Sequence, residues 1–87
     1  MTNTEFYENL EINALVRNYV PTTTGNGLLF NNVLVHIKNN VVTITDINTD
    51  TVIDTTDWKK HFIDNMVMIT LEKVIETLDN GLRLWYN

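Results

Sequence analysis

The segment with the clearest chemical pattern is a run of twelve residues, 46–57, that is rich in oxygen donors. Counted from Asp46, ligand-type side chains stand at positions one, three, five, nine and twelve. Carboxylate, amide and backbone carbonyl oxygens are the ligands that calcium prefers. The candidate calcium ligands are Asp46, Asn48, Asp50, Asp54 and Asp57.

Over these twelve residues the spacing resembles an EF-hand calcium loop, and the resemblance implies a calcium-binding module. Two residues depart from the pattern: Thr51 stands where the sharp turn requires glycine, and Asp57 stands where a glutamate normally binds with both oxygens. The alternative is a polar hairpin turn followed by the start of a helix, with Asp54 or Thr56 as the N-cap.

A second metal set is conceivable on the predicted helix that follows. Asp57, His61 and Asp64 are spaced i, i+4 and i+7, so a helix places them on one face. A catalytic metal would need a further ligand, for which His36 is the candidate. A solvated helix face explains the same three residues without a metal.

Several kinds of catalysis are excluded by composition. The chain has no serine and no cysteine, which removes a serine triad, a thiol nucleophile, a disulfide and a thiolate metal site. Gly25 and Gly27 lack the spacing and the lysine of a phosphate-binding loop. We therefore predict that the protein is not an enzyme and needs no cofactor other than, at most, calcium.

The distribution of charge suggests a basic protein partner. The formal net charge is −5, which argues against direct nucleic-acid binding. Carboxylates gather in the first sixteen residues and around the segment 46–57, where they could steer the protein toward a basic surface. The predicted partner-binding residues are Glu5, Glu8, Glu11, Asp46, Asp50, Asp54 and Asp57. The alternative is ordinary solvation of a small domain.

Length and hydropathy predict one domain, 1–87, that does not enter a membrane. A chain of 87 residues supports one small core. The longest apolar run, residues 66–69, is far shorter than the roughly 18 residues that a membrane span requires. The first five residues lack the basic and apolar regions of a signal peptide, so we expect an intracellular protein.

Residues 4–19 are expected to form a helix, with Thr4 as a possible cap and Pro21 preventing its continuation. This helix has two apolar sides rather than one. Phe6, Leu10 and Ala14 lie on one side, and Ile12, Val16 and Tyr19 lie nearly opposite. Residues 22–27 are polar and glycine-rich, which predicts a loop.

Residues 28–54 predict an antiparallel meander of three strands, with 28–30 as a possible fourth. Two Asn-Asn pairs, 31–32 and 39–40, suit two-residue hairpin turns because asparagine tolerates positive φ. A turn at Asn39-Asn40 sets Ile37 opposite Val42 and Val35 opposite Ile44. One apolar face follows, formed by Val33, Val35, Ile37, Val42 and Ile44.

Residues 57–80 are expected to be helical, with an apolar stripe that changes face near 65–69. Either two helices meet there, or one long helix serves two surfaces and requires a second chain. The Asn80-Gly81 pair is expected to end the helix. Residues 82–87, including Trp85 and Tyr86, then form an apolar tail that is either a core strand or an anchor for a partner.

In size, acidity, lack of cysteine and element order the chain is similar to small phage-encoded inhibitors such as anti-CRISPR proteins, although no motif is shared. The resemblance implies a viral inhibitor in the host cytoplasm whose carboxylates stand in for phosphates in the groove of a nucleic-acid-binding protein. The fold prediction is α+β, with the meander covered by an N-terminal helix and one or two C-terminal helices. The leading function is a protein-binding module, and the alternative is an assembly subunit that forms a homodimer through its helices.

Overall fold

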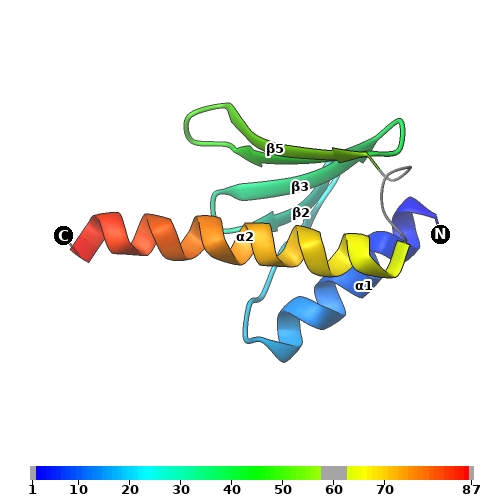
Figure 1. Cartoon of the computed structure of the whole chain (residues 1–87), viewed down its shortest axis with the longest axis horizontal. Helices are drawn as coiled ribbons and strands as arrows, with labels where there is room; N and C mark the ends of the chain where they lie inside the picture. The colour runs from blue at the N-terminus through cyan, green and yellow to red at the C-terminus, as the bar shows by residue number, and fades with distance from the viewer. Residues whose placement is uncertain (1, 58–62, 87) are drawn as a thin grey trace.

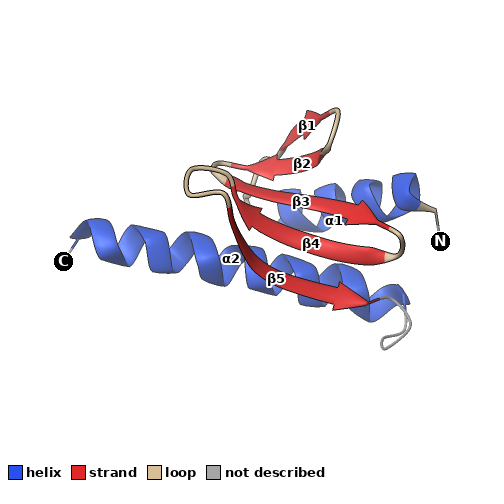
Figure 2. Ribbon diagram, turned by 90° about the horizontal axis from the view of Figure 1, so that it is seen from above, coloured by secondary structure: helices blue, strands red, loops and turns tan. Residues whose placement is uncertain are grey.

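The computed structural model describes residues 2–57 and 63–86, with no description of the side chains of 63, 64 and 81–86. Five strands form one antiparallel sheet in the order β1-β2-β3-β4-β5. Both helices lie on the same face of this sheet (Figures 1 and 2). The elements are α1 (Asn3–Val16), β1 (Thr22–Thr24), β2 (Gly27–Phe30), β3 (Val33–Lys38), β4 (Val41–Asp46), β5 (Thr51–Asp57) and α2 (Ile63–Tyr86). The α+β class is confirmed, with five strands instead of three or four.

The hairpin of β3 and β4 has the register that the sequence predicts. Val35 pairs with Ile44 and Ile37 with Val42. Asn39 and Asn40 both adopt positive φ, 53° and 63°, as a two-residue primed turn requires. The predicted apolar face therefore turns to the core.

Two strand boundaries differ from the prediction. Residues 22–24, expected in a loop, form β1 and pair with β2 across a turn at Gly25 and Asn26. A strand of three threonines has no local pattern of its own, so its pairing with β2 decides its conformation. At the other edge, β5 runs to Asp57, and the expectation that the C-terminal helix starts at Asp57 is wrong.

The first helix starts and ends earlier than predicted. Its N-cap is Thr2, whose hydroxyl accepts a hydrogen bond from the Glu5 amide, so the predicted cap at Thr4 is wrong. The helix ends at a Schellman motif well before Pro21. Asn18 adopts φ 66°, and the Tyr19 amide donates to the Ala14 carbonyl at 2.9 Å.

A single long helix, α2, runs beside α1 on the same face of the sheet (Figure 2). Met66, Val67, Leu71 and Val74 are all buried. Because α1 covers one side of α2 and strands β3 and β4 cover another, a second chain is not needed for its two apolar surfaces. Of the predicted stripe, Trp58 and Phe62 lie outside the described residues.

The second helix continues through Gly81 to Tyr86, so the predicted stop at Asn80-Gly81 and the separate tail 82–87 are wrong. Glycine in a helix interior costs only about 1 kcal/mol relative to alanine, which helical residues on both sides can offset.

The core is formed by one side of α1, the inner face of the sheet and α2. Phe6, Leu10 and Ala14, one of the two apolar sides that the sequence predicts for this helix, are fully buried against it. The opposite side remains exposed: Ile12 is 59% and Val16 is 79% accessible.

Candidate functional site

The structure does not bring the predicted calcium ligands around one point. Asp46 pairs with Thr51 at one end of the β4-β5 hairpin, whereas Asp57 pairs with Val41 at the other. Five residues of β4 separate these pairs, about 17 Å at the usual strand rise. Among the described side chains of residues 2–57 and 65–80, no three of His, Cys, Asp or Glu are grouped as a metal site.

The second metal set cannot be placed as a unit. His61 lies outside the described residues, as does the side chain of Asp64. Asp57 ends strand β5, so the prediction that it lies on a helix with His61 and Asp64 is wrong; His36 lies on strand β3, as expected.

The carboxylates of the β4-β5 hairpin are largely used inside the protein. Asp46 accepts hydrogen bonds from the Asn32 side chain at 3.2 Å and from the Asn48 amide at 3.0 Å, which shapes the turn. Asp54 forms an ion pair with Lys73 of α2. Asp50 lies exposed in the turn with φ 54°. Two of the four predicted contact carboxylates in this hairpin therefore stabilise the fold.

The outer edge of β5 also has features that prevent strand addition. The register with β4 shifts between Ile44 and Thr45, as at a β-bulge. Asp54, opposite the buried Ile44, carries its charge toward α2. Bulges and inward-pointing charges on an edge strand prevent a further strand from pairing with it.

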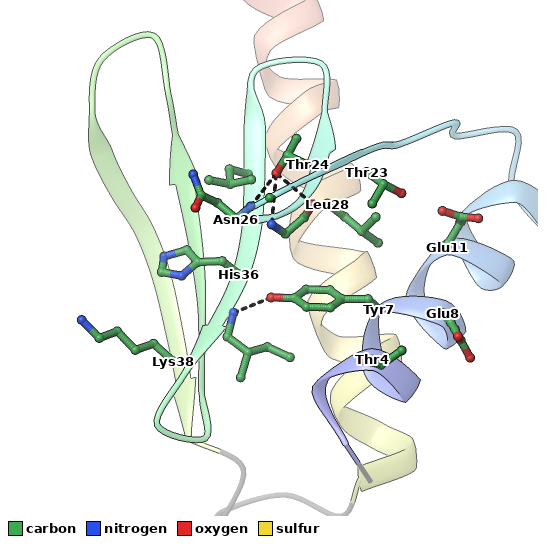
Figure 3. Close-up of a pocket in the computed structure, with 14 residues that line it drawn as sticks. Thr4, Tyr7, Glu8, Glu11, Thr23, Thr24, Asn26, Leu28, His36 and Lys38 are labelled. Atoms are coloured by element: carbon green, nitrogen blue, oxygen red, sulfur yellow. Dashed lines mark hydrogen bonds between the residues drawn. The ribbon is translucent and has the colours of Figure 1, made fainter.

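A groove of about 820 Å³ lies between α1, the β1-β2 hairpin and the end of β3 (Figure 3). Its three sides come from segments that are distant in sequence. The residues that carry its chemistry are Thr4, Tyr7, Glu8, Glu11, Thr24, Asn26, His36 and Lys38. This is the candidate functional site, and we call it the α1-β3 groove.

One wall of the α1-β3 groove is a stripe of α1. Thr4, Tyr7, Glu8 and Glu11 are spaced i, i+3, i+4 and i+7, so they share one side of the helix. Because Phe6 and Leu10 hold the neighbouring side in the core, the stripe must face outward next to the sheet. Glu5 does not belong to this wall and lies at the helix cap instead.

Tyr7 joins the helix to the sheet across the floor of the groove. Its hydroxyl accepts a hydrogen bond from the Ile37 amide at 2.9 Å (Figure 3). Strand β3 continues past the last β2 pair, Leu28 with Val35, so the Ile37 amide has no strand partner on that side. The phenol takes the place of the missing strand carbonyl.

The turn of the β1-β2 hairpin forms the upper rim and is fixed by its own hydrogen bonds. The Thr24 hydroxyl accepts from the amides of Asn26 and Gly27 and donates to the Gly27 carbonyl. Gly27 has φ 148°, and a Cβ there would overlap the Val35 carbonyl oxygen. Only glycine allows the start of β2 to lie this close to the backbone of β3.

The end of β3 forms the third side of the groove, and its His36 and Lys38 side chains extend from the face of the strand that is turned away from α1 (Figure 3). Sequence reasoning placed both on the polar face of the hairpin but did not connect them with Glu8 and Glu11. No local signal could have done so, because the two walls are about 28 residues apart in sequence. The polar residues of α1 at positions i, i+3, i+4 and i+7 were the sequence signal that could have indicated the α1 wall.

Searches against protein-family models, curated proteins and solved structures return no match to this chain. In the part of the chain that the structure describes, no helix has the length and apolar character to cross a membrane. The function therefore has to be argued from the groove itself.

Proposed function

We propose that this protein is a non-enzymatic protein-binding module whose α1-β3 groove binds a segment of a partner that carries a basic side chain. The observation that carries the proposal is the position of Glu8 and Glu11 side by side in the wall of a groove of about 820 Å³. This volume lies in the range of roughly 300–1,000 Å³ that holds small ligands.

Both carboxylates are available to a partner. The ion pair formed within the described ranges joins Lys73 to Asp54, so neither Glu8 nor Glu11 is neutralised by a described cation. Two like charges one turn apart on a helix repel each other. A guanidinium or ammonium group between them relieves that repulsion, and the concave wall reduces its exposure to screening solvent.

The groove is a better candidate than the acidic hairpin that the sequence suggested. Asp46 and Asp54 already have partners within the fold, so binding through them would break interactions that hold the turn and α2. Glu8 and Glu11 have no such role. Of the predicted contact set, these two are the residues that we propose for binding.

The resemblance to phage-encoded inhibitors adds a prediction about the partner. It implies a nucleic-acid-binding protein, whose basic surface would supply the cation that the groove accepts. This prediction supports looking for the partner among such proteins inside the cell.

The proposal is tested by NMR titration of the ¹⁵N-labelled protein with a capped glycine peptide that contains one arginine. Shifts are expected at Tyr7, Glu8, Glu11 and Thr24. The double substitution Glu8→Gln with Glu11→Gln should weaken binding about two- to thirtyfold, since each exposed charge pair contributes about 0.2–1 kcal/mol.

The matched control is Glu72→Gln with Glu76→Gln. These glutamates lie exposed on α2, and their substitution changes the net charge by the same amount. Shifts concentrated in residues 46–57, or an equal loss of binding in the control, would contradict the proposal.

A second candidate function, self-association, is favoured by the uncovered side of α1. Ile12, Leu15, Val16 and Val20 are all exposed large apolar residues. Such a patch is typical of surfaces that bind another protein. Light scattering coupled to size exclusion should then show a dimer that Val16→Glu converts to a monomer, whereas a monomer at all concentrations would remove this candidate.

A further inference from the structure

An exposed aliphatic side chain follows each glutamate of the α1 wall one helical turn later. Ile12 comes four residues after Glu8. Leu15 comes four residues after Glu11. Residues four apart on a helix are neighbours on its surface, with Cβ atoms about 5–6 Å apart. The acidic wall of the α1-β3 groove therefore continues, toward the C-terminal end of α1, into an apolar surface formed by Ile12 and Leu15, which we call the apolar ledge.

The fold leaves the apolar ledge uncovered. Ile12 is 59% and Leu15 is 46% accessible, and both lie on the side of α1 opposite the residues that enter the core. The two side chains also adjoin each other, because residues three apart share one side of a helix. Exposed aliphatic side chains that adjoin one another are typical of interaction surfaces.

The spacing between the charges and the ledge matches that of an extended peptide. A helix rises about 1.5 Å per residue, so the wall advances by about 6 Å from Glu11 to Leu15. An extended chain rises about 3.3 Å per residue and places every second side chain on the same face, about 6.6 Å apart. Side chains at positions i and i+2 of an extended segment that runs along α1 can therefore contact Glu11 and Leu15 together.

The chemistry of α1 favours one basic and one aliphatic side chain in that segment. The helix has no lysine or arginine from Asn3 to Val16, so a bound cation meets no like charge on it. An aliphatic side chain on the ledge removes apolar surface from water on both partners. An acidic side chain at the same place would be repelled by the two glutamates of the wall.

We infer that the α1-β3 groove recognises an extended segment of the partner protein with a basic side chain at the glutamates and, two residues away, an aliphatic side chain on the apolar ledge. The basic half rests on the proposed function, and the aliphatic half adds a requirement of its own. A partner segment suits this surface better than a second copy of the chain, because each copy carries a net charge of −5 and two copies repel each other.

The test uses capped glycine peptides with one arginine and one leucine, and matching peptides in which asparagine, of similar size, replaces leucine. Leucine stands two residues before or two residues after arginine. In a third pair of peptides the two residues are adjacent, which directs their side chains to opposite faces of an extended chain. Binding to the full chain is followed by NMR. In one of the two i, i+2 orders, the leucine peptide should bind about three- to tenfold more tightly than its asparagine match, and the adjacent pair should show no such difference.

Leu15→Gln should abolish this difference, because it removes the apolar contact while glutamine keeps a high helix propensity. The matched control is Ile47→Gln. Ile47 has the same accessibility, 46%, and follows strand β4, outside the residues that line the groove. The control should preserve the preference for leucine.

Equal binding of the leucine and asparagine peptides in both i, i+2 orders would overturn the inference, and arginine-dependent shifts at Glu8 and Glu11 would then leave the proposed function intact. A preference for leucine that survives Leu15→Gln would also overturn the inference. A dimer in size exclusion that covers the ledge and removes the preference would assign the ledge to a second copy instead. If no arginine peptide shifts the groove resonances, both the inference and the proposed function fail.

Discussion

The hydroxyl of Tyr7 should contribute measurably to stability, and Tyr7→Phe isolates that contribution. The substitution keeps the ring, which packs edge-on to Phe6 with centroids 6.1 Å apart, and removes only the acceptor of the Ile37 amide. A typical hydrogen bond contributes about 0.5–1.5 kcal/mol, and a buried donor left without a partner costs about 1–3 kcal/mol. Because Ile37 lines an open groove where water can partly replace the phenol, we expect a loss of about 1 kcal/mol.

This loss is large enough to measure in a domain of 87 residues. It corresponds to a fall in Tm of about 4–8 °C and in the urea midpoint of about 0.3–1 M at unchanged slope. Hydrogen exchange of the Ile37 amide should accelerate more than that of other amides in β3. The control is Tyr19→Phe, whose hydroxyl donates to Asp79 over 3.4 Å and should contribute less. Equal urea midpoints for Tyr7→Phe and the unmodified protein, with unchanged exchange at Ile37, would refute this account of the groove floor.

Three further perturbations test other parts of the fold. Gly27→Ala forces a Cβ against the Val35 carbonyl at a φ of 148°, so it should cost at least about 1–3 kcal/mol, and thermal melts that match the unmodified protein would contradict the close approach. Asn18→Gly should leave stability unchanged or raise it, whereas Asn18→Ala should cost about 1 kcal/mol, because the left-handed conformation at the helix end favours glycine. Urea unfolding in which the alanine variant is the more stable of the two would argue against the Schellman motif. Partial burial and the carboxylate of Asp79 raise the pKa of Tyr19, which favours its protonated form in the folded state, so stability should fall as pH rises above 10. Tyr19→Phe should reduce this pH dependence of stability, measured by urea unfolding. A pH dependence that the substitution leaves unchanged would count against the contact.

Local sequence patterns predicted the parts of the fold whose determinants lie within a few residues. The Asn39-Asn40 turn set the β3-β4 register because two positive φ angles leave few alternative pairings. The helical spacing likewise grouped Phe6, Leu10 and Ala14 on one side of α1, although it did not distinguish this buried side from the exposed one that carries Ile12 and Val16. Both are short-range effects, in which backbone geometry and apolar periodicity act on the same segment.

The errors occur where local preferences were weak or were outweighed by other contacts. The Thr22–Thr24 segment is a strand because β2 offers it hydrogen-bond partners. Gly81 lies inside α2 because helical residues on both sides outweigh its small penalty. The calcium spacing failed because Asp57 pairs opposite Val41, at the far end of the hairpin from Asp46.

The sequence by itself determined the α+β class and the central hairpin with its register, because propensity and periodicity act over one or two turns of chain. Only the tertiary structure decided the candidate site. It brought the acidic stripe of α1 next to the end of β3, and it placed the Tyr7 hydroxyl where the Ile37 amide has no partner from β2. Such long-range contacts depend on how whole elements pack, and no spacing within either segment encodes them.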